Sequence, residues 1–524
     1  MRKIFLINLI LFFSFSGVLF PKTKSSLNNK DVLRSNGIKT YFESNSVVSN
    51  EDLVLQYLNS IQDYFSNDGW LVPAMEDNSG QTFNNAVTAM AFILTGEKQR
   101  AERILDFYAQ RIDSSNSNLN SQNFFYKGEA RGFFQNVNLN DSYTPFICDR
   151  WMGDNAWLLL AFKYYEKVYG FVDKPDYSLV TSDLKNLLLD FYIDDPTGHG
   201  GFVQSGWRWG PRDSSNPVND YKLHVFDSNG NPVGHEEGNI DAYAALKLCG
   251  EDSIAGKIKQ WLDYRMNLLE NIPGISLPLD LFSWRSLAFY NEGDYYKNLV
   301  LVPENDTRFR KVVYFSGKKA VGFYSSADSS VQNVWLDGSG HMVCAFYFAG
   351  YTDTAEYYSN QLDSFLINRN INGTESLALP YTANQTGGYN WVDITKGFSS
   401  SCAWYIFAKE KFNPFTLEKY TPTKIKIDKS EGFNYRFEQN YPNPFNLTTR
   451  IVYTVPSPQQ VEITVYNVLG NSIRTLFNGI SPSGKNKIDW NGKDNNGNVV
   501  GSGIYFYKIQ MKDISFNGKM ILEK

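Results

Sequence analysis

The sequence has few of the residues on which metal sites and nucleophilic catalysis most often depend. Its 524 residues include only four histidines and four cysteines, Cys148, Cys249, Cys344 and Cys402. No C-x-x-C spacing is present, so a zinc or redox site is not expected. A G-x-S-x-G elbow, a phosphate-binding P-loop and an H-E-x-x-H helix are also missing. We therefore expect no metal and no cofactor, and histidine-based mechanisms have few candidate residues.

Clusters of one charge and long apolar runs are scarce as well. The formal net charge is -5, with both signs interspersed, so nucleic acid is not an expected partner. The one long apolar run, Ile4 to Phe20, follows Arg2-Lys3 and precedes Pro21-Lys22. This pattern predicts a signal peptide over residues 1–20 and no stable membrane span in the mature chain. An uncleaved membrane anchor is the alternative, because no clear A-x-A site follows the run.

The length exceeds that of a single ordinary core and predicts at least two domains. After the signal, residues 21–50 are rich in Ser and Asn and indicate a loose N-terminal arm. Residues 51–415 have a helical pattern, residues 416–436 form a Lys- and Thr-rich linker, and residues 437–524 have strand patterning.

One arrangement recurs through residues 51–415. A loop rich in Gly, Asn, Asp and Ser leads into a helix that is apolar nearly all round, and an amphipathic helix follows. A helix that is apolar on every side must be buried on every side, whereas its amphipathic partner can face solvent. We therefore predict an (α/α)6 toroid, with an open α-solenoid as the alternative. The inner helices are expected to start near Asn85, Asp154, Asn239, Trp284, Gly340 and Ser400.

The C-terminal region alternates in the manner of β-strands. Val461, Ile463 and Val465 alternate with Glu462 and Thr464. Gly-containing turn signals separate this run from the others, as in antiparallel hairpins. We predict a small antiparallel β-sandwich over residues 437–524.

The motifs of this region carry a resemblance to a known family. They are Gln439-Asn-Tyr-Pro-Asn-Pro-Phe-Asn446, Val465-Tyr-Asn-Val-Leu-Gly470, Trp490-Asn-Gly-Lys-Asp494 and Gly501-Ser-Gly-Ile-Tyr-Phe-Tyr507. In order and spacing they resemble the type A sorting domains of type IX secretion in the Bacteroidetes and related bacteria. The resemblance implies recognition by the type IX secretion machinery and delivery to the outer cell surface or the medium. A carbohydrate-binding or generic Ig-like module is the alternative.

The central region resembles a fold class only. Gly153-Asp-Asn-Ala-Trp157 and Glu236-Glu-Gly-Asn-Ile-Asp241, set among alternating inner and outer helices, are similar to segments of the six-hairpin glycosidases. In a toroid, the loops before the inner helices gather at one end. Acids in those loops, and most of the eleven tryptophans, would therefore face one cavity, as expected of a sugar cleft.

We expect the protein to hydrolyse glycosidic bonds of a poly- or oligosaccharide with two carboxyl groups. Glu237 is the predicted general acid, and Asp154 or Asp337 the base, in an inverting reaction. Helix capping is the alternative role for Asp154 and Asp337, and Asp241 is expected to be structural. Alternative functions are a polysaccharide lyase or sugar epimerase that uses His235 or a Tyr as base, and a non-catalytic glycan-binding surface protein. The predicted substrate-binding residues are Arg150, Trp151, Trp157, Trp207, Arg208, Trp209, His235, Glu236, Trp335 and Trp391.

Overall fold

The chain divides into two compact units between Tyr420 and Thr421. The predicted signal peptide and nearly all of the predicted N-terminal arm lie outside the residues that the structure describes. The structure is a computed structural model, and it describes residues 48–66, 68–111, 123–126, 129–140, 143, 145–147, 149–208, 233–270, 272, 274–328, 333–384, 392–421, 436–455, 459–482, 484–511 and 515–523.

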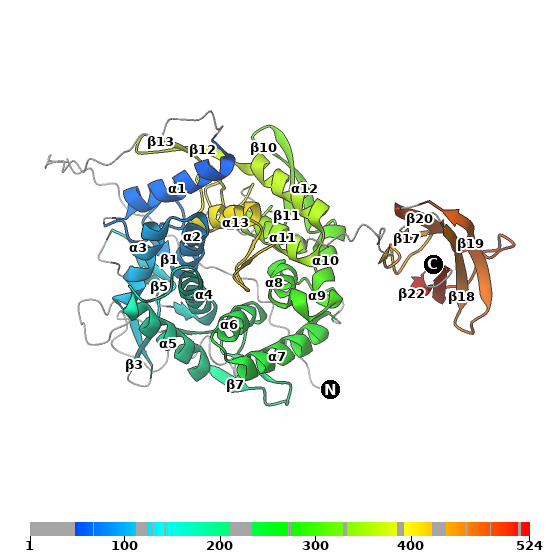
Figure 1. The fold of residues 1–524 in the computed structure, drawn as a ribbon, viewed down its shortest axis with the longest axis horizontal. Helices are drawn as coiled ribbons and strands as arrows, with labels where there is room; N and C mark the ends of the chain where they lie inside the picture. The colour runs from blue at the N-terminus through cyan, green and yellow to red at the C-terminus, as the bar shows by residue number, and fades with distance from the viewer. Residues whose placement is uncertain are drawn as a thin grey trace. The chain divides into compact units, whose positions relative to one another are not determined.

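The first unit is a ring of helices, seen end-on in Figure 1. Along the chain, each inner helix packs against the next, and the last one, α13, packs back against the first one, α2. The ring is therefore closed, which an open solenoid would not be. A helical central region is confirmed, and each inner helix begins one to four residues before its predicted start. The inner helices are α2 (Thr82–Thr95), α4 (Met152–Tyr169), α6 (Glu236–Leu248), α8 (Asp280–Phe289), α11 (Leu336–Ala349) and α13 (Ser399–Lys409).

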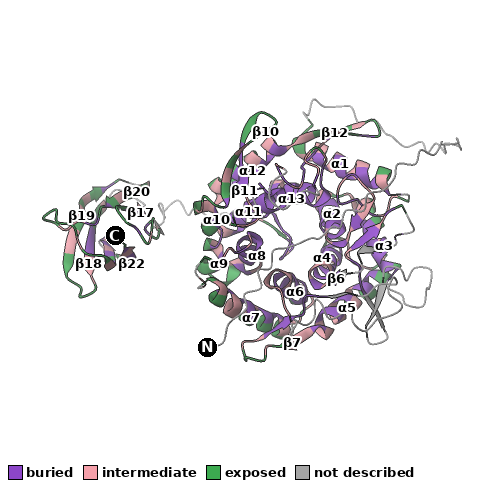
Figure 2. Cartoon of the chain, turned by 180° about the vertical axis from the view of Figure 1, so that it is seen from behind, coloured by how far each residue is buried: buried purple, intermediate pink, exposed green. Residues whose placement is uncertain are grey.

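An outer layer of helices covers the ring. Figure 2 shows inner helices that are buried almost throughout and outer helices that are exposed along one side, which is the pattern the sequence predicts. None of the described helices is long and apolar enough to span a bilayer. The outer helices are α1 (Asn50–Phe65), α3 (Lys98–Ala109), α5 (Pro175–Asp190), α7 (Asp252–Glu270), α9 (Asp294–Asn298), α10 (Leu301–Asn305) and α12 (Thr352–Leu362).

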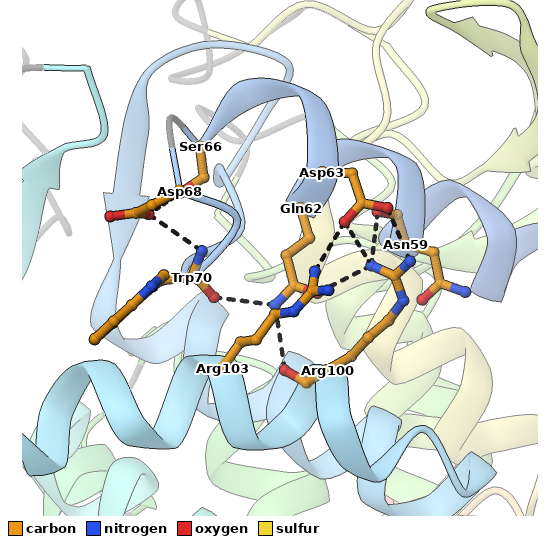
Figure 3. Close-up of polar contacts among 8 residues, drawn as sticks. All are labelled: Asn59, Gln62, Asp63, Ser66, Asp68, Trp70, Arg100 and Arg103. Carbon is orange, nitrogen blue, oxygen red and sulfur yellow. Dashed lines mark hydrogen bonds and ion pairs between the residues drawn. The ribbon is translucent and has the colours of Figure 1, made fainter. Parts of the chain in front are cut away.

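Ion pairs help to hold neighbouring outer helices together. Figure 3 shows Asp63, near the end of α1, between two arginines of α3. Its Oδ2 lies 2.8 Å from Arg100 Nη2 and its Oδ1 lies 2.9 Å from Arg103 Nη1. The Gln62 amide donates to the carbonyl oxygens of Trp70 and Arg100 at 3.0 and 3.2 Å. Because Gln62 is buried, these bonds fix the loop after α1 against α3.

A latch repeats at the fourth residue of the inner helices. The Asn85 amide accepts from the Val72 N–H at 2.8 Å and donates to the Val72 carbonyl at 3.1 Å. Asn155 makes the same two bonds with Phe133, and Asn239 makes them with Val203. Each amide therefore acts like a strand neighbour to the extended segment before its helix, and so fixes the start of that helix.

The same position carries smaller residues in the other three inner helices. Ser339 Oγ accepts from the Phe323 N–H at 3.1 Å, and Cys402 Sγ accepts from the Leu379 N–H at 3.3 Å. Ser283 is the sixth member, and its hydroxyl donates to the carbonyl of Leu279 in its own helix at 3.4 Å. The ring thus repeats one structural unit six times with different side chains.

Contacts in the first turns bring the starts of all six inner helices to one end of the ring. The Asn84 amide of α2 donates to Ser399 Oγ of α13 at 3.0 Å. Leu279, just before α8, packs against Gly338 of α11. The remaining junctions are made by Phe83 with Trp157, Gly153 with Asp241, Glu237 with Asp280, and Asp337 with Ser400 and Ser401.

Aromatic side chains fill the centre of the ring of helices, behind the end at which the inner helices begin. Trp157 lies 5.6 Å from Trp284 and 5.9 Å from Trp404, measured between ring centroids. His341 lies 4.1 Å from Trp404 and accepts from the Trp284 indole N–H at 3.0 Å. Burial holds the pKa of His341 well below its usual value, so this ring is neutral. These aromatic side chains form a packed core at the centre of the ring of helices.

Short antiparallel strands occupy the loops of the first unit, where the sequence pattern predicted only helices. β6 (Asp149–Trp151) pairs with β9 (Gly206–Arg208), and β10 (Arg310–Phe315) pairs with β11 (Lys318–Phe323). The others are β1 (Ser79–Gln81), β2 (Asn123–Tyr126), β3 (Glu129–Phe133), β4 (Asn136–Asn138), β5 (Pro145–Ile147), β7 (Tyr192–Asp194), β8 (Gly201–Val203), β12 (Ile367–Ile371), β13 (Thr374–Ala378), β14 (Phe412–Asn413) and β15 (Glu418–Lys419).

The second unit is β-rich, as the sequence predicts. One sheet has the order β16-β17-β20 and the other the order β19-β18-β21-β22, and their buried side chains form one core around Trp490. Val461, Ile463 and Val465 point into this core, as their alternation predicts. The strands are β16 (Arg436–Phe437), β17 (Thr449–Val455), β18 (Gln459–Asn467), β19 (Ser472–Ser481), β20 (Gly484–Trp490), β21 (Gly503–Gln510) and β22 (Ser515–Leu522).

Candidate active site

Four carboxyl groups meet where α4, α6 and α8 begin. Asp154 lies in the first turn of α4, Glu237 and Asp241 lie in the first two turns of α6, and Asp280 begins α8. Gly153 makes the close approach of α4 and α6 possible, because a Cβ there would lie 2.9 Å from Asp241 Oδ2. These helices start with acids because a carboxylate is favoured by the N-terminal end of a helix dipole.

Burial raises the pKa values of these acids, and the neighbouring carboxyl groups add to the rise in Glu237 and Asp241. Burial and the neighbouring carboxyls of Asp280 and Asp241 raise the pKa of Glu237 well above its ordinary value. Burial and then Asp154 do the same to the pKa of Asp241. Burial raises the pKa of Asp280 to about 6, against a hydrogen bond from Glu237 that lowers it. Glu237 and Asp241 are thus the members that favour the protonated form, and Glu237 donates its proton toward Asp280.

Asp154, like Asp241, has a buried carboxyl oxygen without a hydrogen-bond partner. Burial raises its pKa to about 7, and its Oδ2 has no hydrogen-bond partner although that atom is buried. A buried unpaired carboxyl oxygen is destabilising, and such atoms are found where a ligand or catalytic role requires them. Asp154 does not cap its helix, because Trp151 holds the N-cap position of α4 and no side chain caps it. The capping alternative is therefore wrong for this residue.

Asp337 has the opposite environment. It is 1% exposed, and its carboxylate accepts from the hydroxyls of Ser400, at 2.5 Å, and Ser401. Burial raises its pKa to about 7, and the two serines oppose that rise. Both oxygens are already used to join α11 to α13, so this placement does not suit the predicted role of a base. Capping is also wrong here, because Trp335 is the N-cap residue of α11.

Several predicted substrate-binding residues lie beside the acid cluster. The ladder of β6 and β9 places Arg150 opposite Trp207 and Asp149 opposite Arg208, directly before α4. Arg150 is buried, with its guanidinium 3.6 Å from the centre of the Phe134 ring. Only the backbone of Trp207 and Arg208 is described, and Trp209 and Trp391 lie outside the described residues.

Other predicted substrate-binding residues are placed differently. Trp157 and Trp335 are 1% and 9% exposed, so neither offers an open face on which a sugar can stack, and that prediction is corrected for both. Trp151 and His235 are partly exposed at the starts of α4 and α6, with ring centroids 6.0 Å apart. Glu236 is held by Arg265, whose Nη2 lies 2.7 Å from its Oε1, so its charge is used to tie α6 to α7.

Two members of the cluster were missed or assigned another role from the sequence. Asp280 lies between Leu279 and Leu281, two residues after Pro278, and its carboxylate accepts from the Leu281 N–H at 2.9 Å. Asp241 fits the structural role expected of it in being buried, but its Oδ1 has no hydrogen-bond partner. A visible signal was the spacing of Glu237 and Asp241, four residues apart and therefore on one helix face.

No group of three or more metal-binding side chains is found among the described residues. The described cysteines, Cys249, Cys344 and Cys402, are free thiols.

Comparison with known proteins gives one family match, in the second unit. The model of the FlgD Ig-like domain matches residues 447–514. This family is not that of the type IX sorting domains, so the sorting role stays a prediction, and the match agrees with the Ig-like alternative. A comparison with curated proteins finds no match.

Solved structures similar to the first unit are carbohydrate-active enzymes. A glycosidase variant in complex with glucose is 12% identical, with a TM-score of 0.45, over 69% of this chain and 96% of its own. An alpha-amylase from Clostridium perfringens is 10% identical, with a TM-score of 0.45, over 71% and 100%. The cellobiose 2-epimerase from Spirochaeta thermophila DSM 6192 is 12% identical, with a TM-score of 0.44, over 68% and 92%. Likeness of this degree does not fix an activity.

Proposed function

We propose that the ring of helices is an (α/α)6 toroid that hydrolyses glycosidic bonds of a poly- or oligosaccharide. The observation that carries this proposal is the cluster of Asp154, Glu237, Asp241 and Asp280, which combines a proton-holding carboxyl with an unpaired one at the start of three adjacent helices. Carboxyl pairs with different proton affinities are what glycoside hydrolysis needs.

In this proposal Glu237 is the general acid and Asp154 the base. Glu237 transfers its proton to the leaving glycosidic oxygen as the C–O bond breaks. A water molecule attacks the anomeric carbon, and Asp154 accepts the proton that this water loses. Asp280 then takes part by hydrogen-bonding to Glu237, which fixes the orientation of the acid. Asp337 is left out, since both of its oxygens are occupied by serines.

The protonation states set the expected pH dependence. Asp154 must be ionised to act as base, and its pKa is raised to about 7. Glu237 must be protonated, and its pKa is raised well above the ordinary value. We therefore expect kcat/KM to rise with pH through about 7 and to fall only at higher pH.

A second candidate is a lyase or epimerase that shares the same site. The observation in its favour is His235, a partly exposed ring beside Trp151 at the start of α6. Such an enzyme would remove a proton from the sugar instead of activating water. A lyase would release an unsaturated sugar together with a new reducing end, whereas an epimerase would change the sugar without any new reducing end.

The proposal extends to the route of the protein. The signal peptide, the second unit as a β-sandwich sorting domain, and delivery to the cell surface or medium by the type IX machinery rest on the sequence motifs. Deletion of residues 437–524 is expected to leave the protein in the periplasm of a type IX-competent host. Normal surface delivery of the truncated chain would contradict the sorting role.

The test of the activity is a panel of polysaccharides and oligosaccharides incubated with the full-length protein. Release of reducing ends without absorbance of unsaturated products supports hydrolysis, absorbance of unsaturated products supports a lyase, and a changed sugar composition without cleavage supports an epimerase. Glu237→Gln removes the proton donor and keeps the shape, so turnover should fall about a hundredfold or more. Near-wild-type turnover by a folded Glu237→Gln protein would end the assignment. Binding without turnover of any glycan would favour a non-catalytic surface protein.

A further inference from the structure

The hairpin of β10 and β11 presents an outward row of side chains that the site does not use. Arg310, Val312 and Tyr314 alternate on β10 with inward residues and are exposed, Val312 by 54% and Tyr314 by 79%. Tyr314 stands directly opposite Lys319 in the register. The row from Arg310 to Tyr314 is about 14 Å long, at about 3.4 Å per residue. It is long enough for several units of an extended ligand.

This hairpin is strongly basic in an acidic protein. Residues 307–327 contain five basic residues and no acid, whereas the whole chain has a net charge of -5. Arg308 pairs with Asp306, and Arg310 with Glu304 and the Tyr358 hydroxyl. The lysines of the hairpin, Lys311, Lys318 and Lys319, make no ion pair with any described residue.

The register explains why the sequence did not show this surface. The basic residues occur as two pairs, Arg310-Lys311 and Lys318-Lys319, separated by an apolar stretch. Neither pair is a charge cluster by itself. The antiparallel ladder places both pairs on one hairpin, with Val312 and Tyr314 between them. Because directly opposed residues share a face, Arg310, Tyr314 and Lys319 lie on one face of the hairpin, and Lys311 and Lys318 belong to the other. Folding therefore places basic residues on both faces, with the exposed Tyr314 beside Lys319.

We propose that this hairpin is a surface binding site for an acidic polysaccharide chain, separate from the carboxyl cluster. An exposed Tyr ring offers a face for the C–H side of a sugar, and the ammonium groups of Lys318 and Lys319 attract carboxylate or sulfate groups on the chain. The glycan nature of this partner rests on the function proposed above. The site would hold an acidic glycan near the enzyme while its acids act on a bond.

A second copy of this chain is a less suitable occupant. β10 pairs only with β11 among the described strands, so its other edge is free. Two copies joined by that edge would place the basic residues of both β10 strands in one sheet, and basic residues on an edge strand oppose such pairing. The charge of the hairpin thus favours an anionic partner.

The experiment is affinity electrophoresis of the full-length protein in gels that contain polygalacturonate, dextran sulfate or neutral dextran. We expect retardation by at least one of the acidic polysaccharides, weakened by salt, and none by neutral dextran. Lys318→Ala/Lys319→Ala and Tyr314→Ala should each weaken the binding about tenfold. Lys318, Lys319 and Tyr314 are all exposed, so these variants are expected to fold.

Matched controls remove a tyrosine and two lysines at positions outside the hairpin. Tyr64, which is 57% exposed on α1, serves as Tyr64→Ala, and Lys247→Ala/Lys257→Ala makes the same change in net charge. These controls should bind as the wild type does. Equal weakening by the controls, no binding of any polyanion, or equally tight binding of anionic vesicles or single-stranded DNA would overturn the proposal. Dimerisation through the hairpin in light scattering would overturn it as well.

This binding is separable from catalysis. Glu237→Gln should keep the electrophoretic retardation while it loses turnover. A protein that binds acidic glycans through the hairpin but cleaves none would disprove the proposed hydrolysis and leave the binding site standing. A protein that cleaves a glycan equally well with and without Lys318 and Lys319, and is not retarded, would disprove the binding site alone.

Discussion

Acids lie on two sides of the end at which the inner helices begin, and their hydrogen bonding differs between the two sides. On the side of α4, α6 and α8, Asp154 and Asp241 each keep a buried oxygen without a hydrogen-bond partner. On the side of α11 and α13, Asp337 gives both oxygens to serine hydroxyls. The residue type and the position near the start of a helix are similar, although Asp154 is partly exposed and Asp337 is 1% exposed. The difference lies in whether the neighbouring helix supplies donors, and that separates a candidate catalytic acid from a structural one.

The same substitution on both sides gives the largest expected difference. Asp154→Asn should reduce turnover of an identified glycan about a hundredfold, because the base is lost while the shape is kept. Asp337→Asn should leave kcat within about twofold of the wild type, since its carboxylate does not reach the reaction. Steady-state kinetics with parallel melting curves measure both. A reversed result would move the base to the α11 side.

The structural side should show its importance in stability. Asp337→Ala leaves the hydroxyls of Ser400 and Ser401 without their acceptor in a buried place, which should cost about 2–3 kcal/mol of unfolding free energy. Urea unfolding measures this loss. The double change Ser400→Ala/Ser401→Ala should be as destabilising, because it leaves a buried carboxylate unpaired. Wild-type stability in either variant would mean that the hydrogen bonds between Asp337 and the two serines contribute nothing to stability.

The repeated latch offers a smaller comparison, between two inner helices on the same side. Asn155→Ala removes both bonds to Phe133 and should destabilise the protein by about 2 kcal/mol. Ser283→Ala removes only a weak bond within α8, and less than about 1 kcal/mol is expected. Unfolding by urea, monitored by circular dichroism, compares them. Equal losses would show that the latch is not what distinguishes the two positions.

The protonation of the cluster also predicts how stability depends on pH. Asp154 and Asp280 have folded-state pKa values raised to about 7 and about 6, from ordinary values near 4. The folded state therefore binds more protons than the unfolded chain between pH 4 and 7, and stability is lost as pH rises through that window. Each group contributes roughly 1 kcal/mol per pH unit there.

Melting temperatures measured from pH 5 to pH 8 test this expectation, and they should fall toward the higher pH. The slope should become shallower in Asp154→Asn, which cannot ionise. Asp194→Asn is a suitable control, since Asp194 is an exposed acid whose pKa is lowered by Lys257. A slope that is unchanged in Asp154→Asn would show that burial does not set the protonation of the cluster.

The sequence predicts the inner helices well because their apolar faces have no solvent side. Their starts are missed by a few residues because the first turns contain polar residues, such as Asn84 and Asn85, that resemble a loop. These residues are helical since each bonds across to another segment, and such a partner is not visible in a local pattern. The hairpins of the first unit are missed for the same reason, because their strands are short and lie between long helical signals.

The candidate site could be predicted in part. Glu237 and Asp154 stand out as acids in loop-like segments before apolar helices. Asp280 could not be recognised, because its neighbours Leu279 and Leu281 are apolar and the acid is drawn to the site only by the packing of α8 against α6. The tryptophans mislead in the opposite direction. They cluster in the sequence near the loops, but Trp157, Trp284 and Trp404 pack against one another in the centre of the ring.

The hydrogen bond between Asn84 and Ser399 joins residues that are 315 positions apart in the chain. A ribosome must therefore make nearly the whole first unit before α13 can cover the open side of α2. Until then α2 and α11 expose the apolar faces that α13 covers in the closed ring. Contacts of such long sequence separation form slowly. Folding of this unit is thus expected to finish only after α13 has been made, with its last hairpin as the closing element and a period in which the open ring can aggregate.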